Sequence, residues 1–187
     1  MTELITEQTA PQTQPVLETE RLLLRPFALS DAKEVQRLCG DFAVADTTLN
    51  IPHPYPEGAA EEFISARPAI YEQGEGVIFA ITLKDDGSLV GGMGLSVTKR
   101  FHRAEIGYWI AKPFWNRGYA TEAGKAVVDF GFTQWSLHKI VGTYLRRNPA
   151  SGCVMRKIGL VQEGLLRNHV IKWDRYEDLI TCGIVRA

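Results

Sequence analysis

The chain has 187 residues, 45% of them hydrophobic and 23% charged, and its formal net charge is −1 at pH 7. This size and composition predict one globular domain whose core needs no disulfide staples. The near-zero net charge gives no indication of a nucleic-acid-binding surface, and no run of about 18 apolar residues predicts a membrane span.

The cysteines and histidines indicate neither a disulfide framework nor a zinc site. Cys39, Cys153 and Cys182 are far apart and odd in number, no CxxC pair occurs, and the four histidines form no HExxH. Buried free thiols in a reducing cytoplasm are therefore expected. Residues 1–15 are polar and lack the basic and apolar regions of a signal peptide, so we expect a flexible tail followed by a single domain over 16–187.

The first half of the domain predicts an antiparallel meander, because three successive strands are joined by short links. Asp86-Gly87 is typical of a hairpin turn between two of them. In chain order, the expected elements are a strand over 21–27, a helix from Ser30 or Asp31 toward Leu38, a proline-rich loop over 50–56, a helix over 57–71 interrupted near Pro68, and strands over 77–83, 89–97 and 104–110.

The second half changes from short links to a strand-loop-helix-strand crossover, which makes the two strands it joins parallel. The expected elements are a loop over 112–117, a helix over 120–135, a strand over 139–145, a short helix after Asn148-Pro149, and closing strands over 161–170 and 176–185. The predicted fold class is therefore α+β, with a mixed sheet. Ligands of open sheets with crossovers tend to bind beyond the carboxyl ends of strands, here after Ile110-Ala111.

The segment from Phe114 to Thr121 joins a predicted strand to a predicted helix. A helix start presents unpaired backbone N–H groups and the positive end of the helix dipole, and both attract phosphate. Gly118 allows a left-handed backbone and, with the small Ala120, lets a pyrophosphate approach the chain, while Arg117 adds a positive charge. The alternative is an ordinary strand-to-helix turn that uses glycine for steric reasons.

The run WNRGYATEA, from Trp115 to Ala123, resembles the CoA-pyrophosphate loop of GNAT acetyltransferases, and in particular of the RimJ/RimL-like branch of ribosomal-protein N-acetyltransferases. Other segments resemble this branch in the same order. They are 17–22 and 24–26 as an opening strand, 104–110 as the central strand, 148–151 as an Asn-x-x-Ser segment, 157–160 as a Lys-hydrophobe-Gly segment, and Tyr176 and Asp178 in the final strand. The resemblance implies the GNAT fold, a central mixed, mostly antiparallel twisted sheet with flanking helices and one parallel crossover.

This resemblance implies acetyl-CoA as cosubstrate and direct acetyl transfer to a primary amine in a ternary complex, without a metal. The pantetheine arm would pair with the strand edge, and a backbone N–H near Trp109 or Ile110 would polarise the acetyl carbonyl. The implied cofactor-binding residues are Tyr108, Trp109, Ile110, Trp115, Asn116, Arg117, Gly118, Tyr119, Ala120, Thr121, Asn148 and Ser151.

The chain departs from the family pattern at three positions. Trp115 stands where Gln or Arg is common, Arg156 stands where Glu is common, and Met155 stands where many of these enzymes have a tyrosine that acts as general acid. Because a thioether has no proton to donate, the tyrosine-acid mechanism is not carried over to Met155.

Glu105 is the first candidate for a general base, since an amine attacks only when it is neutral. Strand alternation places Glu105 on the same face as Gly107 and Trp109, where it would also border the acceptor. The alternative is a glutamate that forms a salt bridge with Arg103 or orders a loop. Ser151 matches the serine of the Asn-x-x-Ser segment and would either donate or relay a proton to the departing thiolate, or cap a helix.

His53 and Tyr55 lie in the proline-rich loop that, in this branch, borders the acceptor site, so they are candidate substrate-binding residues. The acceptor itself stays open among a protein N-terminus, a free amino acid or peptide, a polyamine and an aminoglycoside-like compound. No nucleic-acid or membrane partner is expected. The protein is expected to be a monomer or a homodimer.

The alternative function is a non-catalytic module that binds acyl-CoA on the same fold, because fold does not determine function. Gly91-Gly92-Met93-Gly94 lacks the following helix of a dinucleotide-binding loop, so a Rossmann oxidoreductase is disfavoured.

Overall fold

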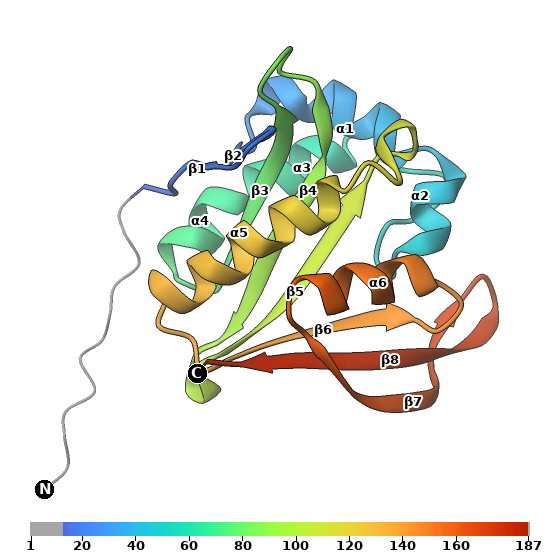
Figure 1. Cartoon of the computed structure of the whole chain (residues 1–187). Coiled ribbons are helices and arrows are strands. Elements are labelled where there is room, and N and C mark those ends of the chain that lie inside the picture. The colour runs from blue at the N-terminus through green and yellow to red at the C-terminus, as the bar shows by residue number, and fades with distance from the viewer. Residues whose placement is uncertain (1–12, 187) are drawn as a thin grey trace, which may run out of the picture.

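The computed structural model describes residues 13–186, which form one eight-stranded sheet with helices on both faces (Figure 1). The strands are β1 (Leu17–Glu18), β2 (Leu22–Pro26), β3 (Gly76–Leu83), β4 (Leu89–Thr98), β5 (Arg103–Ile110), β6 (Lys139–Leu145), β7 (Val161–Lys172) and β8 (Arg175–Val185). The helices are α1 (Ala32–Cys39), α2 (Phe42–Thr47), α3 (Ala59–Ser65), α4 (Arg67–Glu72), α5 (Tyr119–Thr133) and α6 (Pro149–Lys157). None of these helices is long and apolar enough to cross a membrane.

The sheet confirms the predicted mixed topology. Its order is β1-β2-β3-β4-β5-β6-β8-β7, and only the β5–β6 pair is parallel. The predicted helix over 57–71 is interrupted as expected, because α3 ends before Ala66 and Pro68 lies in the first turn of α4. Gly87 has the positive φ of 72° that the predicted hairpin turn between β3 and β4 requires.

The strand predicted over 21–27 is confirmed as β2. The opening segment over 17–26, which the family resemblance presents as one strand, is instead a hairpin in which β1 turns back at Thr19 and pairs with β2. Residues 1–12 of the tail predicted over 1–15 lie outside the described residues. Gln14, which is described, donates a side-chain hydrogen bond to the Ile78 carbonyl at 2.9 Å, so this end of the predicted tail contacts the sheet.

Helix α2 was not predicted, because six residues are too few to show helical periodicity. Contacts from distant residues stabilise it instead. Trp173, in the β7–β8 turn, donates from its indole N–H to Asp46 at 2.8 Å, and Arg147 donates to the same carboxylate at 3.0 Å. Lys172 donates to the carbonyls of the segment that follows α2. The β7–β8 hairpin therefore holds α2 beside the central strands.

The core has two layers, one on each face of the sheet. Apolar side chains of α5 and α6, such as Val127 and Met155, pack against one face. Val35 of α1 and Ile64 of α3 pack against the other face, where Trp109 of β5 joins them. Strand β5 lies between the layers, so its alternate side chains enter both.

The two parallel strands separate within the sheet. Their ladder ends at the pair Glu105 and Val141, although β5 stays paired with β4 up to Ile110 and β6 stays paired with β8 up to Leu145. Met155 of α6 packs at the start of this gap: a Cβ added at Gly142 would lie 2.9 Å from its sulfur. A gap therefore opens between the carboxyl-terminal halves of β5 and β6.

A matched pair of glycines tests this packing. Gly94 of β4 and Gly107 of β5 face each other in the ladder, but a Cβ at Gly94 would lie 2.1 Å from the Val77 carbonyl oxygen, whereas a Cβ at Gly107 would meet nothing within 4 Å. We expect Gly94→Ala to lower the free energy of unfolding by about 2 kcal/mol or more, through overpacking against backbone. Gly107→Ala is the control. Urea unfolding curves with equal midpoints for the two variants would contradict the described packing.

Candidate active site

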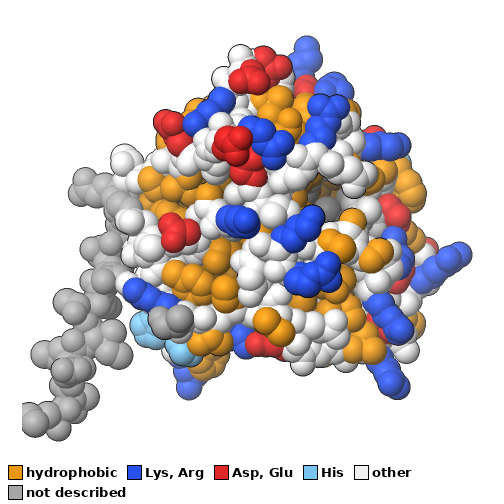
Figure 2. All heavy atoms as spheres, viewed as in Figure 1, with side chains coloured by type: hydrophobic (Ala, Val, Ile, Leu, Met, Phe, Trp, Pro, Cys, Tyr) orange, Lys and Arg blue, Asp and Glu red, His pale blue; other side chains and the backbone are white. Residues whose placement is uncertain are grey.

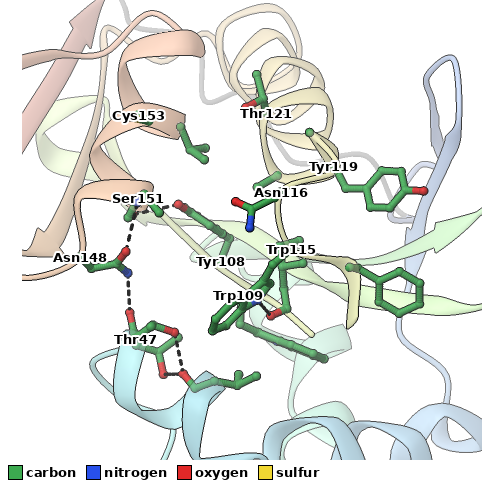
Figure 3. Close-up of a pocket in the computed structure, with 18 of the residues that line it drawn as sticks. Thr47, Tyr108, Trp109, Trp115, Asn116, Tyr119, Thr121, Asn148, Ser151 and Cys153 are labelled. Atoms are coloured by element: carbon green, nitrogen blue, oxygen red, sulfur yellow. Dashed lines mark hydrogen bonds between the residues drawn. The ribbon is translucent and has the colours of Figure 1, made fainter. Parts of the chain in front are cut away.

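A cavity of about 420 Å³ lies at the carboxyl-terminal end of β5, between the starts of α5 and α6 and the end of α2 (Figure 3). Lys and Arg side chains gather around the middle of the face that carries α5 and α6 (Figure 2). The cavity is lined by Val44, Thr47, Thr48, Tyr108, Trp109, Ile110, Phe114, Trp115, Asn116, Gly118, Tyr119, Ala120, Thr121, Asn148, Ala150, Ser151, Cys153, Val154 and Lys157.

The loop before α5 forms a cradle of backbone amides. Asn116 and Gly118 have positive φ values of 61° and 83°, and Gly118 is the N-cap of α5. The bond from the Glu122 N–H to the Gly118 carbonyl, at 3.0 Å, begins the helix, so the N–H groups of the preceding first-turn residues have no partner within it. Left-handed residues followed by a helix start form an anion-binding concavity. This arrangement fits a pyrophosphate.

Trp115 fixes this loop to the strand before it. Its indole N–H donates to the Ile110 carbonyl at 2.6 Å, across the end of β5. The tryptophan that departs from the family pattern is therefore a structural tie between loop and strand, as well as part of the cavity wall.

The N-terminal hairpin also holds the loop. The Glu122 carboxylate accepts from the Thr19 hydroxyl at 2.6 Å and from the Arg21 N–H and Nε at 2.7 Å. The Arg21 guanidinium donates in addition to the Arg117 carbonyl at 3.0 Å and lies over the Tyr119 ring. Burial by itself raises the pKa of Glu122, but the hydrogen bonds from Thr19 and Arg21 outweigh it and hold that pKa below its ordinary value.

The start of α6 carries a second set of polar contacts (Figure 3). The Asn148 side chain accepts from the Ser151 N–H at 3.2 Å and donates to the Thr47 carbonyl at 3.1 Å. Asn148 is therefore the N-cap of α6 and ties it to α2. The alternative that Ser151 caps the helix is wrong, because its hydroxyl lies 2.8 Å from the Tyr108 hydroxyl instead.

The edge of β5 that faces the gap has free backbone groups at alternate residues. Ala111 donates its N–H to Val90 at 2.8 Å, and residues of an antiparallel ladder point alternately to its two sides. The N–H of Trp109 therefore faces β4, whereas those of Tyr108 and Ile110 face the gap. Of the two amides predicted near the acetyl group, only that of Ile110 points toward this edge.

The structure brings the predicted cofactor residues together, since each of them except Arg117 lines the cavity. The Arg117 guanidinium lies outside the lining and over the Phe114 ring, 5.8 Å from its centroid. Arg117 thus contributes its backbone to the loop, while its exposed side chain points elsewhere.

Three further predicted residues lie outside this cavity. Glu105 is exposed and accepts from the Thr143 hydroxyl at 2.8 Å, rather than pairing with Arg103. His53 is exposed and its ring packs against Phe42. Tyr55 packs among the side chains around α1 and α3, and burial raises its pKa to about 12.

The face of β5 that carries Glu105 has its own hollow. A cavity of about 350 Å³ is lined there by residues that include Gly107, Ser96 and Arg67. Because a Cβ at Gly107 would meet nothing within 4 Å, the sheet is open at this point. Glu105 lies two residues away on the same face of the strand.

Sequence reasoning missed the contributions of α2 and of the exposed face of α6. Val44, Thr47 and Thr48 belong to or follow the unpredicted helix. The spacing of Ala150, Cys153, Val154 and Lys157 is that of one helix face, and this signal could have identified them. Cys153 also corrects the expectation of buried thiols: Cys39 and Cys182 are buried, but Cys153 is exposed.

Comparison with known proteins agrees with this geometry. A family model described as an acetyltransferase (GNAT) domain matches residues 21–161. The chain is 30% identical over 173 residues to Uncharacterized N-acetyltransferase YoaA of Bacillus subtilis, covering 92% of this chain and 97% of that relative. It is 23% identical over 134 residues to the ribosomal protein uS5-alanine N-acetyltransferase of Escherichia coli, covering 71% of this chain and 69% of that one.

A solved structure is similar over most of the chain. Mycobacterium smegmatis RimJ, in complex with CoA-disulfide, has a TM-score of 0.81 and 25% sequence identity, covering 91% of this chain and 86% of that one. The predicted likeness to the RimJ/RimL branch is thereby confirmed.

Two glycines with the same backbone geometry test the amide cradle. Gly118 and Gly58 are both left-handed N-caps, of α5 and α3, with φ values of 83° and 79°. Alanine at either position should cost about 1–2 kcal/mol of backbone strain. Only Gly118→Ala should weaken acetyl-CoA binding, by about tenfold or more, because it displaces the cradle. Calorimetric titration measures this, and equal affinities for both variants would remove the cradle from the binding site.

The contact between Arg21 and Glu122 predicts a pH-dependent stability. Near neutral pH, Glu122→Gln should lower the free energy of unfolding by about 1 kcal/mol, or the Tm by about 2–4 °C. A carboxyl group whose pKa is lowered in the folded state stabilises the fold at every pH above the ordinary glutamate pKa of about 4.3. This contribution disappears as the pH falls through the pKa that the group has in the folded state. The deficit of the variant should therefore vanish near pH 3. A stability deficit of Glu122→Gln that persists near pH 3, or that the exposed control Glu72→Gln shows as well, would contradict a stabilising contact between Arg21 and Glu122.

Proposed function

We propose that this chain, which belongs to the GNAT acetyltransferase family and is an N-acetyltransferase, takes its acetyl group from acetyl-CoA and passes it directly to a primary amine in a ternary complex. One observation carries the proposal: an amide cradle at the start of α5 lies beside the unpaired edge of β5, in one cavity. The cradle suits a pyrophosphate, and the unpaired strand edge suits an extended arm that contains amide groups, so the cavity fits a ligand that has both.

The donor would bind along the cavity from the cradle to the gap. Its pyrophosphate would accept hydrogen bonds from amides of the segment 116–121, and Lys157 in the lining adds a positive charge. The pantetheine amides would pair with the backbone N–H and carbonyl of Tyr108, as an added strand does. The Ile110 N–H, which faces this edge, would polarise the acetyl carbonyl.

The amine would approach from the opposite face of β5, over Gly107. That face is open and carries the Glu105 carboxylate, which holds one hydrogen bond from Thr143 and retains further acceptor capacity. Glu105 would remove the ammonium proton through an intervening water, since it lies outside the donor cavity. His53 and Tyr55 would act at a greater distance, as part of the outer acceptor region.

Ser151 would protonate the departing thiolate. It lines the donor cavity, and the N-cap Asn148 holds its backbone in place. Met155 cannot take this role, since it is buried among Ile106 and Gly142 and carries no acidic proton.

The acceptor is a protein N-terminal α-amine or a small-molecule amine, and the reaction takes place in the cytoplasm. The name of the Escherichia coli relative supports an α-amine. A screen of amines that follows thiol release from acetyl-CoA would identify the acceptor. It would start with peptides that have an N-terminal alanine and include spermidine.

Titration calorimetry with acetyl-CoA, CoA and NAD tests the donor assignment. We expect the two CoA compounds to bind and NAD not to bind. Failure of both CoA compounds would contradict the proposal. Binding without thiol release across the amine screen would instead favour a regulatory module that binds acyl-CoA.

The proposed base predicts a separation of rate from affinity. Glu105→Gln should lower kcat by about 10²-fold or more at neutral pH and leave the dissociation constant of acetyl-CoA nearly unchanged. Raising the pH should partly restore the rate, since more of the amine is then neutral. The exposed Glu72→Gln is the matched control. Full activity of Glu105→Gln at every pH would remove Glu105 from the mechanism.

A further inference from the structure

Tyr108 and Ser151 form a pair of hydroxyl groups in the wall of the donor cavity, 2.8 Å apart (Figure 3). They come from different elements, β5 and α6, which the gap between β5 and β6 brings together. The capping of α6 by Asn148, and the bond from Asn148 to the Thr47 carbonyl, fix where Ser151 lies. The contact is therefore built by the fold rather than made between two free surface side chains.

A serine hydroxyl alone is a poor source of a proton for a thiolate. Thiols in proteins have an ordinary pKa of about 8.5 and tyrosine one of about 10, whereas serine does not ionise in this range. Transfer from Ser151 alone would leave an alkoxide, which is far less stable than the thiolate that it protonates. Serine can pass on a proton only if a second group replaces it.

We propose that Tyr108 supplies the proton that Ser151 passes to the departing CoA sulfur. This inference rests on the proposed function and assigns the source of the proton in that reaction. Tyr108 acts through Ser151, so it is a relay partner rather than a group that touches the reacting atoms.

The proposed step conserves atoms and charge. The neutral amine nitrogen bonds to the acetyl carbon, the bond between that carbon and sulfur breaks, and the nitrogen, positively charged after the attack, releases one proton to water and becomes the neutral amide nitrogen. The sulfur takes the Ser151 proton, while the Ser151 oxygen takes the Tyr108 proton, and the negative charge rests on the Tyr108 oxygen. Water returns a proton to Tyr108 after CoA and the amide leave.

The surroundings of Tyr108 suit this role. Burial raises its pKa, which the bond with Ser151 partly opposes, so the phenol stays protonated at neutral pH. The other titratable side chains that line the described cavity are Tyr119 of α5 and Cys153 and Lys157 of α6.

The chain offers a matched control in Tyr144. It lies on β6 beneath the same helix, close to Gly152, where an added Cβ would be 2.6 Å from its hydroxyl oxygen. It does not line the donor cavity. Tyr144→Phe therefore removes the same hydroxyl from the same region without touching the relay.

Using hydroxylamine as the acetyl acceptor isolates the protonation of the CoA sulfur from the deprotonation of the amine. Hydroxylamine is largely neutral at pH 7, so no base has to remove a proton before it attacks, and the reaction is followed by thiol release from acetyl-CoA. After subtraction of the uncatalysed rate, Tyr108→Phe should lower kcat by about 10²-fold, with the acetyl-CoA dissociation constant changed by less than about threefold. Ser151→Ala should be impaired similarly, and the double variant should be no worse than the poorer single variant. Tyr144→Phe should resemble the wild type.

Replacing Tyr108 by 3-fluorotyrosine keeps the hydrogen bond and lowers the pKa of the phenol. The alkaline limb of the kcat profile should then move to lower pH, which a purely structural role of Tyr108 would not cause.

The outcomes separate this inference from the proposed function. A wild-type chain that does not bind acetyl-CoA contradicts the proposed function. A chain that binds acetyl-CoA contradicts the relay alone if its Tyr108→Phe variant releases thiol at the wild-type rate, if fluorination leaves the alkaline limb in place, or if the wild type does not accelerate release to hydroxylamine.

Discussion

The separation of two paired strands is the constraint on which the rest of this structure depends. β5 and β6 stop pairing after Glu105 and Val141, although each keeps its neighbour on the other side. Backbone groups without partners are costly unless they meet water or a ligand. Met155 fills the closed end of the gap, while the open end becomes the cavity wall. The unpaired edge of β5 is the energetic cost of the separation, and in the proposed function it would also bind an extended ligand.

The negative charge of Glu122 beside the amide cradle is neutralised by a residue of the N-terminal hairpin. An acidic residue in the first turn of a helix interacts favourably with the helix dipole, but Glu122 would also repel a pyrophosphate bound there. Arg21 neutralises this carboxylate and at the same time binds the Arg117 carbonyl of the loop. The N-terminal hairpin is therefore a structural part of the proposed phosphate site, although it lies about a hundred residues away in sequence.

The sequence predicts local geometry well and long-range contacts poorly. Gly118 and the helix after it could be identified, because a left-handed N-cap has a residue-specific requirement. The bond from Trp115 to the Ile110 carbonyl, and the contact of Arg21 with Glu122, join residues whose proximity only the folded chain defines. Ser151 shows both sides of this limit. The Asn-x-x-Ser spacing identifies a helix start, but the identity of the cap and the Tyr108 contact follow from tertiary structure.

The two faces of β5 give direct transfer a simple spatial arrangement. Alternate side chains of one strand point to opposite faces, so Tyr108 lies in the wall of the donor cavity while Glu105 and Gly107 lie on the open opposite face. In the proposed reaction a proton leaves the amine on one side of the acetyl carbon, and another reaches sulfur on the other side. A single rigid strand that carries the base on one face and the relay on the other holds both groups in a fixed relation to the carbonyl. A site built on two independent loops would have to order them anew in each turnover. In the proposed reaction, the alternation of side chains along β5, more than the identity of any one residue, would therefore separate the acid from the base.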